Sequence, residues 1–274
     1  MDQLEKIKEK SLEILSDFDQ FCKANDLTYS IAFGTLLGAV RHQGFIPWDD
    51  DIDVDMYIED YVKLEKLWNE RGNKEKYFLQ TKKSDPNISS TFYRLRMNNT
   101  TSMDKIGLKV PMHWGIPLDI FPYYNAPKSK AGRYIMEQTY RWSQRISGYN
   151  HKHPKGPKIL RNATTTATVI LTDLLYLISK SAGETQEIFF ACGYTDRTQY
   201  CSRDVLLPVT TIKFEDLTLM APNKPVAYLE WQYGDFRSLP PEEKRVGHPT
   251  WIIDMEHDYK DYLEGRLECP RDIE

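Results

Sequence analysis

Hydrophobic residues recur along the first part of the chain with spacings that predict helices alternating with short strands. A helical spacing covers residues 4–24, and another resumes after Gly34 in the run GTLLGAVR. Between Ile52 and Met56, apolar residues alternate with aspartates, which is the period of a strand. A further helix is expected over residues 59–71. This alternation predicts an α/β domain.

Downstream, the pattern predicts more strands and then a mainly helical stretch. Strands are expected at residues 77–81 and 91–97, and at 115–121, where Pro122 should end the strand because proline has no N–H for the ladder. From about residue 130 to 190 the spacing is mainly helical. Strands near residues 205–220 and a last helix near 226–233 follow. The expected fold class is α/β, a mixed sheet with flanking helices plus a mainly helical second half.

Composition narrows the class of protein. The 274 residues are 41% hydrophobic and 28% charged, which is typical of a folded globular protein. A net charge of -4 argues against a surface built for nucleic acid, so no nucleic-acid partner is expected. The four cysteines form no CxxC pair, which argues against a zinc knuckle. The N-terminus lacks a continuous apolar core, so we expect a cytoplasmic protein.

Two adjoining segments raise the question of membrane contact. Residues 163–179 are almost uncharged, but they are rich in threonine and shorter than a typical spanning helix, so we predict a soluble helix. Its apolar stripe would comprise Ile170, Leu171, Leu174, Leu177 and Ile178. Residues 141–161 carry six basic residues and no acid. This segment is either a solvated loop or a surface that docks a lipid-linked acceptor or the inner face of the membrane.

The chemistry is expected where the acids gather. Between Arg41 and Lys63 the chain has seven acidic residues and no lysine or arginine. Asp51 and Asp53 alternate with apolar residues, so a structured strand would hold their carboxylates close together and favour a divalent cation. An oxygen-only pair suits Mg²⁺ or Mn²⁺ better than zinc. The alternative is an exposed acidic turn.

Five motifs, taken in order, resemble those of one family. They are GTLLGAVR at 34–41, GFIPWDDDIDV at 44–54, YRLRMNNT at 93–100, LDIFP at 118–122, and YGDFRSLP at 233–240 followed by His248. Together they resemble the LicD family of phosphocholine transferases, which belong to the nucleotidyltransferase superfamily and are related to fukutin. The resemblance implies a nucleotidyltransferase-like fold and transfer of phosphocholine from CDP-choline to a hydroxyl of a cell-surface glycan or teichoic-acid precursor, with release of CMP.

The resemblance also implies roles for particular residues. Asp51 and Asp53 match the metal-binding carboxylate pair, and Asp119 matches a third carboxylate on a neighbouring strand. Gly34 and Thr35 match the turn beside the donor phosphates. These three aspartates are the expected catalytic and metal-binding residues, with Mg²⁺ or Mn²⁺ as the cofactor.

Further residues are assigned by chemistry and by closeness in the sequence. Arginine binds phosphate oxygens bidentately, so the candidates for the donor phosphates are Arg41 and Arg96, together with His248. A quaternary ammonium is recognised by aromatic faces, so the candidates for choline are Trp48, Trp114 and Tyr123. The alternative is structural: the arginines could pair with the acids internally, and the aromatic residues could lie in the core.

Three regions are predicted: a catalytic core at residues 1–128, a helical acceptor-side or membrane-proximal insertion at 129–200, and a segment at 201–274 that packs back and completes the site. Other functions stay open. The cargo could be another CDP-activated alcohol phosphate, such as ribitol, glycerol or ethanolamine. The chain could instead be a nucleotidyltransferase that uses an NTP, or a non-catalytic module that binds nucleotide or glycopolymer.

Overall fold

A seven-stranded mixed sheet forms the centre of the computed structural model, which describes residues 3–191, 199–247 and 250–269. Only the β2–β6 pair is parallel among the described pairings, and the other strands pair antiparallel. The predicted mixed sheet is therefore confirmed. In order across the sheet, the strands are β1 (Ser30–Ile31), β2 (Asp53–Tyr57), β6 (Pro117–Asn125), β4 (Tyr93–Met97) and β3 (Tyr77–Gln80), with β7 (Glu187–Phe190) on β6 and β8 (Tyr200–Ser202) on β7.

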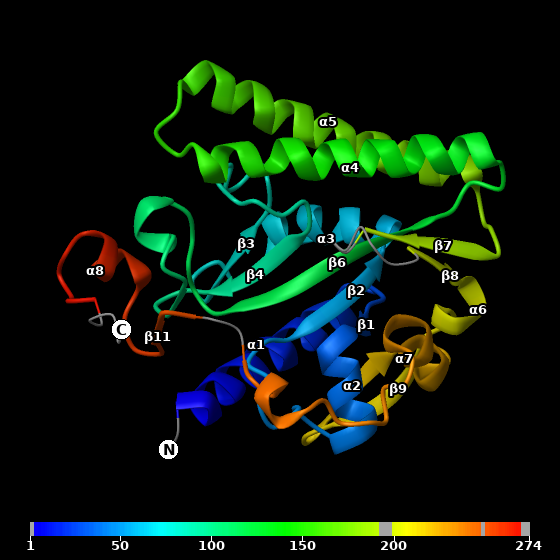
Figure 1. The fold of residues 1–274 in the computed structure, drawn as a ribbon, viewed down its shortest axis with the longest axis horizontal. Coiled ribbons are helices and arrows are strands. Elements are labelled where there is room, and N and C mark those ends of the chain that lie inside the picture. The colour runs from blue at the N-terminus through cyan, green and yellow to red at the C-terminus, as the bar shows by residue number, and fades with distance from the viewer. Residues whose placement is uncertain (1–2, 192–198, 248–249, 270–274) are drawn as a thin grey trace.

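Helices lie on both sides of this sheet (Figure 1). The long helices α4 (Lys130–Lys152) and α5 (Lys158–Ala182) run side by side along one side. On the other side lie α1 (Gln3–Ala24), α2 (Phe33–His42) and α7 (Pro225–Tyr233). The α/β class and the mainly helical stretch that begins near residue 130 are as predicted. The remaining helices are α3 (Ile58–Arg71), α6 (Arg203–Leu206) and α8 (Tyr259–Leu263), with 3-10 turns at Gly107–Lys109 and Glu242–Lys244.

Two small antiparallel pairs complete the fold. Strand β9 (Thr210–Phe214) pairs with β10 (Leu217–Ala221), and β5 (Thr101–Met103) pairs with β11 (Ile252–Asp254). The second pair joins the C-terminal part of the chain to the first half. The predicted last helix corresponds to α7, but α8 follows it, so the prediction that it is the last helix was wrong.

Pro122 does not end its strand, contrary to the sequence-based expectation. Strand β6 continues through it to Asn125. On one edge, β4 pairs with β6 only as far as Ile120, and β7 takes over from Tyr123. The Asp119 amide donates toward β2. Because successive amides along a strand point to opposite edges, the nitrogen of Pro122 points to the other edge of β6, where β7 replaces β4 as the neighbouring strand. The missing N–H therefore falls between the two pairings.

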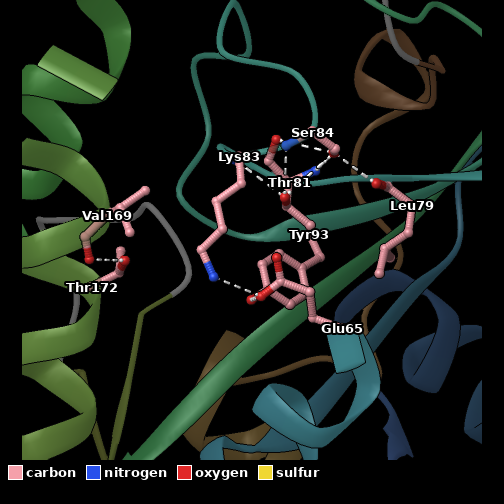
Figure 2. A network of polar contacts seen from close by, with 8 residues as sticks. All are labelled: Glu65, Leu79, Thr81, Lys83, Ser84, Tyr93, Val169 and Thr172. Atoms are coloured by element: carbon pink, nitrogen blue, oxygen red, sulfur yellow. Dashed lines mark hydrogen bonds and ion pairs between the residues drawn. The ribbon is translucent and has the colours of Figure 1, made fainter. Parts of the chain in front are cut away.

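A polar network fixes β4 against α3 and the turn after β3 (Figure 2). The Tyr93 hydroxyl and the Lys83 ammonium both contact the Glu65 carboxylate, at 3.1 and 3.0 Å. The Tyr93 amide donates to the Tyr61 hydroxyl at 2.8 Å, and the two rings stack at 4.0 Å. These contacts anchor the residue immediately before Arg94.

The apolar stripe predicted for residues 163–179 does not form the buried face of α5, because none of its five residues is buried. Thr168, Leu175 and Ser179 are buried against the rest of the protein, whereas Ile170 and Leu177 are 60% and 57% exposed. Within the described residues, no helix is both long enough and apolar enough to cross a membrane.

Candidate active site

A cavity of about 880 Å³ lies at one end of the strands β2, β4 and β6. Charged residues on these strands line it. The start of α2 and the acidic segment before β2 form one wall. The last turn of α4 and the segment around β11 contribute His151, Thr250 and Ile253. The charged lining residues are Asp49, Asp50, Asp51, Asp53, Asp104, Asp119, Arg94 and Arg96. Six carboxylates therefore face two guanidinium groups.

Strand register brings the two principal carboxylates together. Asp53 and Asp119 are paired residues on the parallel strands β2 and β6, and Asp51 lies two positions before Asp53. Burial is the largest cause that raises the pKa of Asp53, and the charges of Asp51, Asp119 and Asp49 raise it further. The site is thus an acidic cluster that a cation would stabilise.

Arg94, which the sequence analysis did not select, supplies the opposing charge at this cluster. Its Nε donates to Asp119 Oδ1 at 2.8 Å and its Nη2 to Oδ2 at 3.2 Å, which is the bidentate geometry of an arginine–carboxylate pair. Arg94 and Asp119 are also register partners on β4 and β6, and Arg94 lowers the pKa of Asp53. The period-two pattern of YRLRM gave a signal for it, because Arg94 and Arg96 share a strand face.

The start of α2 faces the cavity through Phe33 and Gly34. Its N-cap, Ala32, makes no side-chain capping bond, and the first amides of a helix have no partner within the helix. Phe33 has φ of 43°, a strained value for a bulky residue, and such strain is often found at functional sites. Thr35 does not line the cavity. Its hydroxyl instead accepts from the Asp53 amide at 2.8 Å and so fixes the start of β2.

Arg96 lines the same wall of the cavity as Arg94, but its side chain is buried. It is 4% exposed, and it donates to Gln80 Oε1 at 2.6 Å and to the Gly115 carbonyl at 2.7 Å. Burial, and then the charge of Arg94, lower the pKa of Arg96 to about 9. Arg96 therefore combines a structural role in the sheet with a position in the cavity wall.

The acidic side chains suit a cation whose remaining ligands are oxygen atoms of the substrate. Among the described residues, no three His, Cys, Asp or Glu side chains are arranged as a ready metal site. Asp51 and Asp53 nevertheless both line the cavity, and the charge of Asp51 acts on Asp53; Mg²⁺ is commonly held by one or two carboxylates together with phosphate oxygens and water. The chemistry of the donor set thus matches Mg²⁺ or Mn²⁺ bound together with a phosphorylated substrate.

Several predicted site residues lie elsewhere. Arg41 donates to the Phe236 carbonyl at 3.0 Å, and the Arg245 guanidinium lies 5.5 Å from the Trp48 ring; neither Arg41 nor Trp48 lines the cavity. Tyr123 is buried in the core beside Phe190. The other two predicted site residues in this group are His248 and Trp114. His248 lies outside the described residues, whereas Trp114 does line the cavity, with its indole N–H bonded to the Val110 carbonyl at 3.0 Å.

His151 is a second lining residue that the sequence analysis did not assign to the site. It lies in the last turn of α4, and its Nδ1 is buried without a hydrogen-bond partner. A buried polar atom without a partner in the protein is able to form a hydrogen bond with a bound ligand. No motif in the sequence indicated this position, because only the packing of α4 brings His151 to the cavity.

Comparison with known proteins agrees with this arrangement. Residues 26–152 match the family model described as LicD/FKTN/FKRP, nucleotidyltransferase domain. Residues 26–152 are a LicD-family domain. The resemblance noted in the sequence is thereby confirmed. This LicD domain contains the acidic segment, β2, β4, β6 and all of α4, and hence most of the cavity wall.

Similarity to one relative extends beyond the LicD domain. The chain is 28% identical over 254 residues to the lipopolysaccharide cholinephosphotransferase LicD of Haemophilus influenzae, a match that covers 86% of this chain and 92% of that protein. A shorter match of 45 residues, 44% identical, joins the chain to the human ribitol 5-phosphate transferase FKRP and covers 16% of this chain and 9% of FKRP. Both relatives are transferases of substituted phosphate groups.

Proposed function

We propose that this protein is a metal-dependent transferase that moves phosphocholine from CDP-choline to a hydroxyl of a cell-surface glycan precursor and releases CMP. The observation that carries the proposal is the pairing of Asp53 with Asp119 on adjacent parallel strands, with Arg94 bound to Asp119, inside one large cavity. The similarity to the Haemophilus cholinephosphotransferase over 92% of that protein's length supports the choice of cargo.

The charge of the cavity supports a cation in the reaction. Six lining aspartates against two arginines would repel a diphosphate, so an anionic donor needs additional positive charge. Mg²⁺ or Mn²⁺, when bound by Asp51 and Asp53, would supply that charge and neutralise the phosphates as CMP leaves. The N–H groups at the start of α2 would add hydrogen bonds to the phosphate oxygens.

The transfer itself breaks one phosphorus–oxygen bond and forms another. The acceptor hydroxyl oxygen attacks the phosphorus of phosphocholine, and the bond to the bridging oxygen breaks, so that CMP leaves with the electron pair. The acceptor proton passes to a carboxylate at the site, for which Asp119 is the candidate because Arg94 fixes its orientation. The remaining contribution of the protein is to position the two substrates.

Another phosphorylated alcohol is the second candidate cargo. The match to FKRP favours ribitol phosphate, but it covers only 45 residues. Trp114 is the one predicted choline contact that lines the cavity, and an aromatic face favours a quaternary ammonium over a polyol.

The test is calorimetric titration of the intact chain with CDP-choline, CDP-ethanolamine, CDP-ribitol and CTP, each with Mg²⁺. Wild type, Asp53→Ala and the exposed control Asp216→Ala would be compared. We expect binding of CDP-choline that requires Mg²⁺, is lost in Asp53→Ala and is retained in the control. Preference for CDP-ribitol would indicate ribitol phosphate as the cargo in place of phosphocholine. If none of the four nucleotides bound, the proposal would be refuted.

A further inference from the structure

The hairpin of α4 and α5 exposes apolar side chains where a soluble helix pair usually exposes polar ones. On α5, Ile159, Ile170, Leu174 and Leu177 are 87%, 60%, 40% and 57% exposed. They are separated by 11, 4 and 3 positions, so they follow one face of a helix with 3.6 residues per turn. This face, which we call the outer stripe, points away from the buried Leu175 and Ser179.

Helix α4 extends this surface with aromatic residues. Tyr134 and Trp142 are 65% and 52% exposed. The two helices are antiparallel, and the Asn150 amide bonds to the Thr165 hydroxyl, so Trp142 lies at about the level of Leu174 on the neighbouring helix. The exposed faces of both helices therefore form one surface on the hairpin, whose two helices run side by side on one side of the sheet in Figure 1.

Positive charge flanks this apolar surface along α4 and at the turn between the helices, whereas the exposed Asp173 lies beside Leu174 on α5. Between Gln138 and Thr172 the chain has no aspartate or glutamate. The exposed cations there are Arg141 and Arg145 on α4, and Lys152, Lys155 and Lys158 around the turn between the helices. The Arg145 guanidinium lies 5.3 Å from the Trp142 ring. Apolar, aromatic and basic residues thus occur together on one exposed face.

We propose that this face binds the surface of an anionic phospholipid bilayer, with the outer stripe at the level of the acyl chains and the cations among the headgroups. Helices that lie in a membrane interface combine an apolar face carrying tryptophan or leucine with flanking lysine and arginine. A protein partner fits less well, because the cores of protein interfaces are depleted of lysine. The surface therefore matches lipid in both charge and polarity.

This docking would also orient the cavity. His151 lies in the last turn of α4, beside the basic turn, and lines the cavity. A bilayer bound at the hairpin would lie near that side of the opening, where a lipid-linked acceptor could enter. Only this last step depends on the proposed function, because lipid binding itself requires no transferase activity.

The test is sedimentation of the intact chain with vesicles of equimolar phosphatidylglycerol and phosphatidylcholine, and with phosphatidylcholine alone. We expect binding to the anionic vesicles that weakens as salt rises. The triple change Lys152→Gln, Lys155→Gln and Lys158→Gln should lower the partition coefficient about 100-fold, since each lysine near anionic lipid contributes about fivefold. The matched control changes the exposed Lys6, Lys66 and Lys213 to glutamine and should bind within about twofold of wild type.

A second pair of variants tests the outer stripe. Ile170→Ser with Leu177→Ser should abolish most binding, whereas the exposed controls Leu239→Ser with Val246→Ser should not. Circular dichroism would check that all variants stay folded. Failure of wild type to bind anionic vesicles, or equal losses in test and control variants, would overturn the proposal. Light scattering that shows a wild-type dimer abolished by Ile170→Ser and Leu177→Ser, without vesicle binding, would assign the surface to a second copy instead.

Discussion

Asp55 gives a prediction whose size follows from its surroundings. The residue is 0% exposed on β2, and the hydroxyls of Ser30 and Tyr228 donate to its carboxylate. Burial raises the pKa of Asp55 from 3.8 to about 7, against the lowering effect of the two hydroxyls. Between these two values the folded protein keeps a proton that the unfolded chain releases, so the free energy of unfolding falls as the pH rises.

Replacing Asp55 by asparagine should remove this pH-dependent loss. One pKa unit corresponds to about 1.4 kcal/mol, so the titration of Asp55 costs about 2 kcal/mol at pH 5 and about 4 kcal/mol at pH 8, relative to a group that stays neutral. In an asparagine at this position, the amide oxygen can accept from the Ser30 hydroxyl, and the NH2 group on the other side can donate to the Tyr228 hydroxyl oxygen. We therefore expect Asp55→Asn to gain about 2–3 kcal/mol of stability relative to wild type between pH 5 and pH 8.

Urea unfolding at pH 5, 6.5 and 8 measures this difference. The exposed Asp216→Asn serves as the control and should show no trend in its difference from wild type. A difference between Asp55→Asn and wild type that stays constant from pH 5 to pH 8 would refute the reasoning, because it would mean that Asp55 has the same pKa in the folded and unfolded chains.

Three further predictions concern the cavity. Arg94→Lys keeps the positive charge but loses the two parallel N–H groups that hold the Asp119 carboxylate. The kcat measured by CMP release should therefore fall about 10- to 100-fold, with an unchanged circular dichroism spectrum. An unchanged kcat would contradict the positioning role. His151→Gln should raise the KM for the glycan acceptor and leave that for CDP-choline unchanged, and equal changes in both would argue against an acceptor-side role. Trp114→Ala should weaken CDP-choline about tenfold more than CMP in titrations, and equal losses would remove the choline contact.

The acidic strand was predictable because alternation reports which residues share a face. The period-two pattern around Asp53 depends only on neighbouring residues, and the order of the motifs linked Asp119 to it. The pairing of Asp119 with Arg94 depends on the register of β4 against β6, which local sequence does not encode. Arg94 was therefore missed, although the same pattern that drew attention to Arg96 contains it.

The choline and phosphate assignments relied on nearness in the sequence, which long-range packing overrides. Tyr123 shares a strand face with Asp119, but four residues along a strand correspond to about 13 Å, and Phe190 from β7 covers that position. Arg41 reaches a carbonyl 195 positions away in the sequence. No local pattern predicts such a contact. The roles of Asp51, Asp53, Asp119 and Gly34 stay predictions until the titrations above are done.

The pairing of β5 with β11 sets an order for building the cavity during synthesis. Ile253 lies opposite Ser102, and both line the cavity, yet a ribosome makes Ile253 long after Asp119. At about 5–20 residues per second, roughly 7 to 27 seconds separate the two. Over that interval the nascent chain contains Asp53 and Asp119 but lacks the part of the wall that β11 supplies. Any selectivity that depends on this part of the wall can therefore arise only after Ile253 has been made, later than the carboxylates.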